Sequence, residues 1–150
     1  MPRHEPSEHG GSLGRQPPER GFFHRFMRYW LPVLVYLTVI FSVSAQPNLQ
    51  TPMPFRNSDK LWHLLEYAGL GLLLGRALRA GLRGRVALVV VAASLAIGSL
   101  IGAADETFQR NIPGRVSSAL DWAADTVGVA LAQGLILWLG REPRREARWL

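Results

Sequence analysis

The chain has 150 residues, no cysteine and a formal net charge of +6 at pH 7. This length predicts one domain, and the lack of cysteine excludes a disulfide framework and a thiolate site. The positive charge comes almost entirely from arginines that flank apolar blocks, which favours a membrane over a nucleic acid as the partner.

The two ends of the chain are predicted to be basic tails. Residues 1–28 are expected to form a disordered N-terminal tail, because residues 1–21 are rich in Gly, Pro, Glu, Arg and His and show no apolar period. Residues 141–150 are expected to form a short basic C-terminal tail. Residues 29–140 lie between the tails and are predicted to form one transmembrane domain.

Four apolar segments follow one another in this domain. They are Tyr29–Ala45, Leu61–Leu78, Val86–Ala104 and Leu120–Leu139. Each is close to the roughly 20 residues that span a bilayer as a helix. The sequence therefore predicts an all-α polytopic membrane protein, a four-transmembrane-helix bundle.

Two alternatives compete with this prediction. The first is a soluble four-helix bundle, but Val86–Ala104 carries no charge and has no polar face to show to water. The second is a cleaved signal peptide ending near Ala45, although the segment Tyr29–Ala45 is long for the apolar part of one.

The distribution of basic residues predicts the orientation of the helices. With four crossings, one side of the membrane receives the arginines before the first segment, those between the second and third, and those after the fourth. The other side receives Arg56, Lys60, Arg110 and Arg115. The positive-inside rule then places both termini in the cytoplasm, so the loops Gln46–Lys60 and Asp105–Ala119 face outward.

Polar residues recur at helical spacing near these outward loops. One face of the second segment carries them at i, i+4, i+7 and i+8. These residues are Asp59, His63, Glu66 and Tyr67. Asp121 and Asp125 stand at i and i+4 on the fourth segment, and Asp105 and Gln109 have the same spacing where the third segment ends.

Acidic residues are concentrated at this outward end. Six of the eleven in the chain lie here, namely Asp59, Glu66, Asp105, Glu106, Asp121 and Asp125. An unpaired carboxylate is costly inside a bilayer, and ionisable groups there are more often functional than decorative. We expect their partners to be Lys60, His63, Tyr67, Gln109 and Arg115.

At these residues the sequence resembles the VanZ-like family. Asp59-Lys60-Leu61-Trp62-His63, Tyr67 and Leu70-Gly71 are similar to its Asp-Lys-x-x-His-x-x-x-Tyr-x-x-Leu-Gly signature. Asp105-Glu106, Gln109, Pro113-Gly114-Arg115, Asp121 and Gly128 are similar to its Asp-Glu-x-x-Gln, Pro-Gly-Arg and Asp-x-x-x-Asn-x-x-Gly signature. Asp125 departs from the pattern, because many members carry Asn there.

This resemblance covers about residues 29–140 and implies a small multi-pass protein of the bacterial cytoplasmic (inner) membrane. It also implies a family-level link to the cell envelope and to resistance against the glycopeptide antibiotic teicoplanin. It assigns no reaction to the chain, and none is carried over.

Binding is the first functional hypothesis. An outward pocket with Lys60, His63 and Arg115 would take the phosphate of an anionic envelope lipid or a lipid-linked cell-wall precursor, because arginine grips phosphate with two parallel hydrogen bonds. The carboxylates oppose a bare anion site unless a divalent cation bridges them. In that variant Mg²⁺ or Ca²⁺ would be held by Asp105, Glu106, Asp121 and Asp125.

Two other hypotheses remain open at this point. In a purely structural clasp, Arg115 would bridge Asp121 or Asp105, and His63 would be held by Asp125 and Glu66. In a membrane-embedded hydrolase or transferase, His63 with Asp125 would act as a general base. The chain has no Gly-x-Ser-x-Gly elbow, no His-Glu-x-x-His zinc motif and no phosphate loop, so the sequence favours a protein that is not an enzyme.

Overall fold

The computed structural model describes residues 18–47, 58–82 and 86–140, and every regular element in these ranges is an α-helix. In chain order they are α1 (Pro18–Tyr29), α2 (Leu31–Ser44), α3 (Ser58–Gly81), α4 (Ala87–Gln109) and α5 (Ala119–Leu139). The all-α prediction is therefore confirmed for the described part of the chain. The expected C-terminal tail, residues 141–150, lies outside it.

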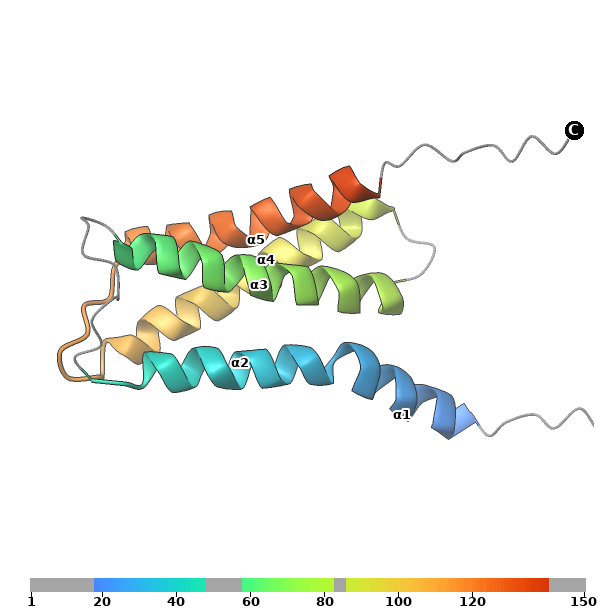
Figure 1. Ribbon diagram of the computed structural model, residues 1–150, viewed down its shortest axis with the longest axis horizontal. Helices are drawn as coiled ribbons and strands as arrows, with labels where there is room; N and C mark the ends of the chain where they lie inside the picture. The colour runs from blue at the N-terminus through green and yellow to red at the C-terminus, as the bar shows by residue number, and fades with distance from the viewer. Residues whose placement is uncertain (1–17, 48–57, 83–85, 141–150) are drawn as a thin grey trace, which may run out of the picture.

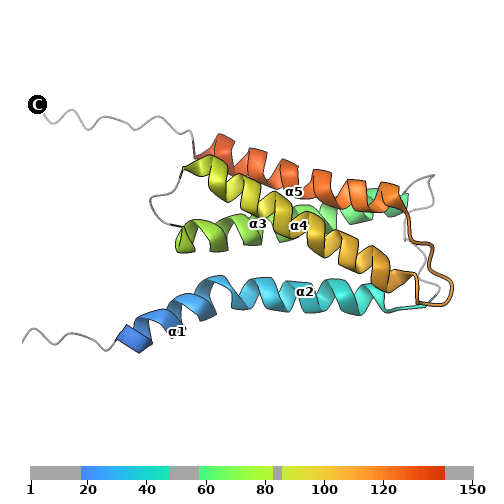
Figure 2. The same ribbon diagram turned by 180° about the vertical axis from the view of Figure 1, so that it is seen from behind.

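The long helices lie side by side and alternate in direction (Figures 1 and 2). The end of α2, the start of α3, the end of α4 and the start of α5 meet at one end of the molecule, which we call the loop end (left in Figure 1). The first turn of α1 and the last turn of α5 lie at the opposite end. Helix α3 contacts all four other helices and packs most extensively against α5.

Three helices of the described residues are long and apolar enough to cross a membrane: Gly21–Ser44, which runs through the junction of α1 and α2, Ala87–Gln109 and Ala119–Leu139. Helix α3 is not among them, because five charged residues are spread along its 24 residues. These are Asp59, Lys60, Glu66, Arg76 and Arg79. The multi-pass prediction thus holds for three of the four segments, and the fourth crossing stays a prediction.

The disordered tail expected over residues 1–28 is wrong where α1 begins, at Pro18. Phe22, Phe26 and Tyr29 recur at i, i+4 and i+7, so this short helix has an apolar face, which begins just after the polar stretch of residues 1–21. That face lies against α3, where the Arg76 guanidinium sits 5.3 Å from the centre of the Tyr29 ring. Arg76 also donates to the Arg28 carbonyl at 3.3 Å. Residues 1–17 lie outside the described part of the chain.

Helix α4 is longer than the sequence predicted. The expected loop over Asp105–Ala119 begins only after Gln109, since α4 continues for one more turn beyond Ala104. Asp105, Glu106 and Gln109 are therefore buried helical residues and not loop residues. Their fixed place on α4 lets them face α2, α3 and α5 at the loop end.

The backbones of α3 and α5 approach each other closely at two glycines. A Cβ added to Gly128 would collide with the Leu64 carbonyl oxygen, and one added to Gly71 would come within 2.9 Å of the Val129 Cα. Gln133 Nε2 donates to the Gly71 carbonyl at 2.8 Å, so a buried side chain joins the two helices there. Small residues at helix interfaces allow this kind of contact in membranes.

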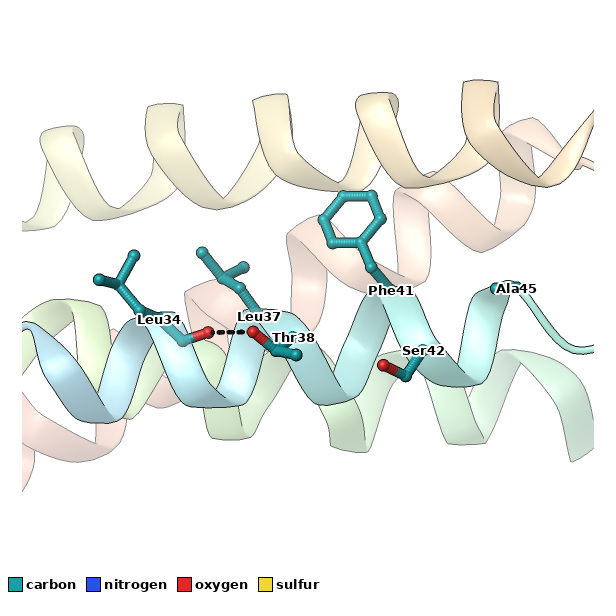
Figure 3. Close-up of a pocket in the computed structure, with 6 residues that line it drawn as sticks. All are labelled: Leu34, Leu37, Thr38, Phe41, Ser42 and Ala45. Atoms are coloured by element: carbon teal, nitrogen blue, oxygen red, sulfur yellow. Dashed lines mark hydrogen bonds between the residues drawn. The ribbon is translucent and has the colours of Figure 1, made fainter.

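Helix α2 is attached by a narrow stripe, since Val33, Ile40 and Ser44 are its buried residues. On another face lies a groove of about 560 Å³, shown in Figure 3. Its lining residues are Leu34, Leu37, Thr38, Phe41, Ser42 and Ala45. Phe41 points from α2 toward α4, where its ring meets that of Phe108 edge to face at 5.9 Å. The Thr38 hydroxyl donates to the Leu34 carbonyl of its own helix at 3.0 Å, which suits apolar surroundings.

We expect Gly128→Ala to destabilise the protein by about 1–3 kcal/mol, the usual cost of overpacking, because the new methyl group meets α3 backbone atoms that have no room to move. The matched control is Gly134→Ala on the same helix, where an added Cβ meets nothing within 4 Å. Thermal unfolding followed by tryptophan fluorescence in detergent measures both. Equal melting temperatures for the two variants would contradict the close approach of α3 and α5.

Candidate functional site

Two ion pairs join α3 to α5 at the loop end. Lys60 Nζ lies 2.9 Å from Asp121 Oδ1 and 2.7 Å from Asp59 Oδ2, so one ammonium group serves two carboxylates. About one turn deeper, His63 Nδ1 lies 2.9 Å from Asp125 Oδ1. The helical spacing of these residues, together with the glycine contacts farther along, sets the two helices in register so that each base faces an acid.

Helix α4 contributes a second layer of polar contacts. Gln109 Nε2 donates to Asp105 Oδ2 at 3.0 Å and to Ser44 Oγ at 3.2 Å, which links α4 to the end of α2. Glu106 Oε2 accepts a hydrogen bond from the Ser118 backbone N–H at 2.8 Å. This carboxylate therefore holds the connection that leads into α5.

Several buried polar atoms at the loop end have no hydrogen-bond partner among the described residues. They are Tyr67 OH, Asp105 Oδ1, Glu106 Oε1 and Asp125 Oδ2. Each of the three carboxylates thus uses one oxygen and leaves the other unpaired. A buried polar atom without a partner costs about 1–3 kcal/mol, so such atoms mark a place where a further group fits.

A cleft of about 680 Å³ opens beside these residues. Its polar lining includes Asp59, His63, Glu66, Gln109, Arg115 and Asp121, and its apolar lining includes Val43, Trp62, Leu65 and Val116. The cleft therefore has one charged part and one apolar wall. Ligand sites of membrane-facing proteins need both when the ligand is amphipathic.

Arg115 reaches the cleft through a tight turn. Gly114 has a φ of 77°, a conformation that glycine adopts without strain, and the Arg115 backbone N–H closes the turn by donating to the Ile112 carbonyl at 3.1 Å. Arg115 is half-buried and forms no ion pair within 4.0 Å among residues 18–47, 58–82 and 86–140. It is a cation in the cleft without a close counter-ion in the part of the chain that the structure describes.

Only some of the side-chain pairs predicted from the sequence form in the structure. His63 contacts Asp125 as expected. Arg115 does not bridge Asp121 or Asp105, because Lys60 pairs with Asp121 and Gln109 with Asp105. Lys60 stands on α3, which faces α5, and therefore lies closer to Asp121 than Arg115 on the loop does.

The carboxylates proposed as a metal site, Asp105, Glu106, Asp121 and Asp125, do not converge as a set. Two of them, Glu106 and Asp125, come together with His63 instead. Asp121 pairs with Lys60 and Asp105 accepts from Gln109, and neither belongs to this group. Glu66 lines the cleft, its backbone carbonyl accepts from Tyr36 OH at 2.9 Å, and it lies in no ion pair within the described ranges.

Sequence reasoning missed Tyr36, Ser44 and Trp62 as neighbours of the site. Ser44 carried the clearest signal, since a serine at the buried edge of an apolar helix needs a partner. Tyr36 and Trp62 carried none, because aromatic residues on apolar helices are common.

Neither a family model, nor a curated protein, nor a solved structure matches the chain. The resemblance to VanZ-like proteins therefore stays a prediction, and the chemistry of the site follows from its own contacts.

We expect His63→Ala to lower the melting temperature, because it leaves the buried Asp125 carboxylate without a cation. The double variant His63→Ala/Asp125→Ala should lose less than the sum of the single variants, by about 0.5–3 kcal/mol, since it also removes the stranded acid. A double-mutant cycle in detergent with a chelator present measures this coupling. Strictly additive losses would mean that the two side chains do not interact.

Proposed function

We propose that the protein is a VanZ-like, four-helix protein of the bacterial cytoplasmic membrane that binds the phosphate of an envelope lipid or lipid-linked cell-wall precursor in the loop-end cleft. The observation that carries this proposal is Arg115, a cation that lines the cleft without a close counter-ion among the described residues. A guanidinium can take two phosphate oxygens at once.

The rest of the cleft suits the other parts of such a ligand. Trp62, Leu65 and Val116 give it an apolar wall, on which a lipid chain loses contact with water. Tryptophan is also enriched where membrane helices meet the head-group layer. An amphipathic molecule with its phosphate at Arg115 would therefore rest on matching surfaces on both sides.

A fourth crossing by α3 is part of this proposal. The 24 residues of α3 reach about 36 Å at 1.5 Å per residue, enough for the hydrocarbon layer. Four of its five charged residues lie in its first or last turns, Glu66 lines the cleft, and its middle packs among the other helices with Leu70, Gly71 and Leu74 buried. Polar residues of membrane helices usually face the interior of a bundle in this way.

A structural clasp is the second candidate, and the two α3–α5 ion pairs favour it. It accounts for Lys60 and His63, whose partners lie within 2.9 Å. It leaves Arg115 and the unpaired carboxylate oxygens without a role, so lipid binding accounts for more of the site. A hydrolase is less well supported, because Ser117 Oγ accepts from Arg110 and Ser118 Oγ caps α5.

The orientation can be tested with single cysteines, since the chain has none of its own. We expect Asn111→Cys to react with a membrane-impermeant maleimide on intact cells, because Asn111 is exposed in the outward loop. Gly81→Cys, at the opposite end and in open space, should react only after permeabilisation. The reverse pattern would place the cleft on the cytoplasmic side.

Lipid binding can be tested by native mass spectrometry of the protein in nanodiscs that contain phospholipid and polyprenyl phosphate. We expect the wild type to retain an anionic lipid and Arg115→Ala to hold it roughly 10- to 150-fold more weakly, the effect of losing about 1.5–3 kcal/mol of charge-assisted hydrogen bonds.

The matched control is Arg110→Ala, which removes an exposed arginine of the same loop that hydrogen-bonds Ser117. Arg110→Ala should retain the lipid as the wild type does. If none of the three proteins retains a lipid, binding at Arg115 is contradicted, and the clasp formed by the two α3–α5 ion pairs is the better account.

A further inference from the structure

Three side chains from three different helices converge below the cleft. His63 on α3, Glu106 on α4 and Asp125 on α5 each offer one ligand atom, and these atoms all lie within 4.8 Å of one another. They stand far apart in the sequence, so only the packing of the helices brings them together. His63 also lines the cleft, which places the group at its floor.

The two carboxylates of this group are almost fully buried, with Glu106 4% exposed and Asp125 0% exposed. Each uses one oxygen, since Glu106 Oε2 accepts from Ser118 and Asp125 Oδ1 contacts His63. The other oxygens, Glu106 Oε1 and Asp125 Oδ2, have no partner among the described residues. These two buried oxygens, together with the neighbouring imidazole, are a set of ligand atoms suited to a cation.

The charge balance of the loop end points the same way. Six carboxylates gather there, and the basic residues described at this end are Lys60, Arg110 and Arg115, with His63 able to add one charge. Arg56, the other base of these loops, lies outside the described residues. Lys60 is shared between Asp59 and Asp121, and Arg110 is exposed and bonded to Ser117. His63 is thus the only base within 4.0 Å of Glu106 or Asp125 in the described ranges. A divalent ion would offset both buried charges.

Gly102 of α4 packs directly against the Asp125 carboxylate. A Cβ added to Gly102 would lie 2.9 Å from Asp125 Oδ2, so any larger residue there would crowd the carboxylate. The glycine therefore lets α4 bring Glu106 close to α5 without pressing a side chain of its own against Asp125.

We propose that His63, Glu106 and Asp125 bind a divalent transition-metal ion, Zn²⁺ or Mn²⁺. One imidazole nitrogen and two carboxylate oxygens suit these ions better than Mg²⁺ or Ca²⁺, which prefer oxygen alone. Three protein ligands leave a position open toward the cleft, as in zinc sites that bind an exchangeable ligand. A phosphate oxygen would take that position, and this last link alone rests on the proposed lipid binding.

Zinc binding is tested on the full-length protein in detergent, stripped of lipid and purified without a histidine tag. His4, His9 and His24 are replaced by alanine in every protein compared, so that His63 is the one histidine left. After exposure to Zn²⁺ and removal of the excess, we expect about one zinc per chain by elemental mass spectrometry. Bound zinc should also raise the melting temperature, because it binds the folded state.

The decisive variant is Asp125→Asn, and its matched control is Asp59→Asn, the same change at an aspartate outside the three ligands. Asp125→Asn should weaken zinc binding by at least about 100-fold, beyond the 10- to 100-fold effect of residues that only support ligands. Asp59→Asn should keep the wild-type affinity. Glu106→Gln provides a second test if Asp125→Asn does not fold.

The inference is overturned if the wild type retains neither Zn²⁺ nor Mn²⁺ and its melting temperature does not respond to them. Equal zinc loss in Asp125→Asn and Asp59→Asn, or none in either, would also overturn it. Retained lipid without metal contradicts the ion site alone, and retained metal without lipid contradicts lipid binding alone. The two proposals can thus fail separately.

Discussion

The close contact between the backbones of α3 and α5 is the constraint on which the rest of the structure depends. Gly71 and Gly128 let the helices approach until the Gln133 side chain of α5 reaches the Gly71 carbonyl of α3. That approach brings Lys60 and His63 within reach of Asp121 and Asp125. A buried polar group without a partner is costly, so the helices that supply these partners must stay together.

At the loop end some polar groups have all their hydrogen-bond or ion-pair partners among the described residues, and others do not. Lys60 pairs with both of its aspartates, whereas Gln109 bonds one oxygen of Asp105 and the other has no partner among the described residues. Arg115 has no ion pair among the described residues, and one oxygen each of Glu106 and Asp125 has no hydrogen-bond partner there. A fold that needed only stability would gain from apolar residues at such positions, because a half-satisfied polar network is worse than an apolar core. These open groups are the basis of the lipid and metal sites proposed above.

The sequence predicted the four long helices and the end at which the polar residues gather, because apolar runs and i, i+4 spacing are local patterns. It did not predict α1, since three aromatic residues on one face are hidden in a basic, proline-rich composition. It also misassigned the partner of Asp121 and the convergent ligand set. Spacing shows which residues share a face of one helix, but which helices face each other depends on packing that includes Gly102 and Gly128.

The narrow attachment of α2 gives the molecule an uneven distribution of stability. With Val33, Ile40 and Ser44 as its buried residues, α2 has less apolar surface to lose on separation than α3 or α5. Its polar links to the neighbouring helices are Tyr36 to the Glu66 carbonyl and Gln109 to Ser44. Local opening occurs where such contacts are fewest, so α2 is the wall of the cleft that yields first. A ligand of the kind proposed would then have a route past α2 that leaves the α3–α5 pair undisturbed.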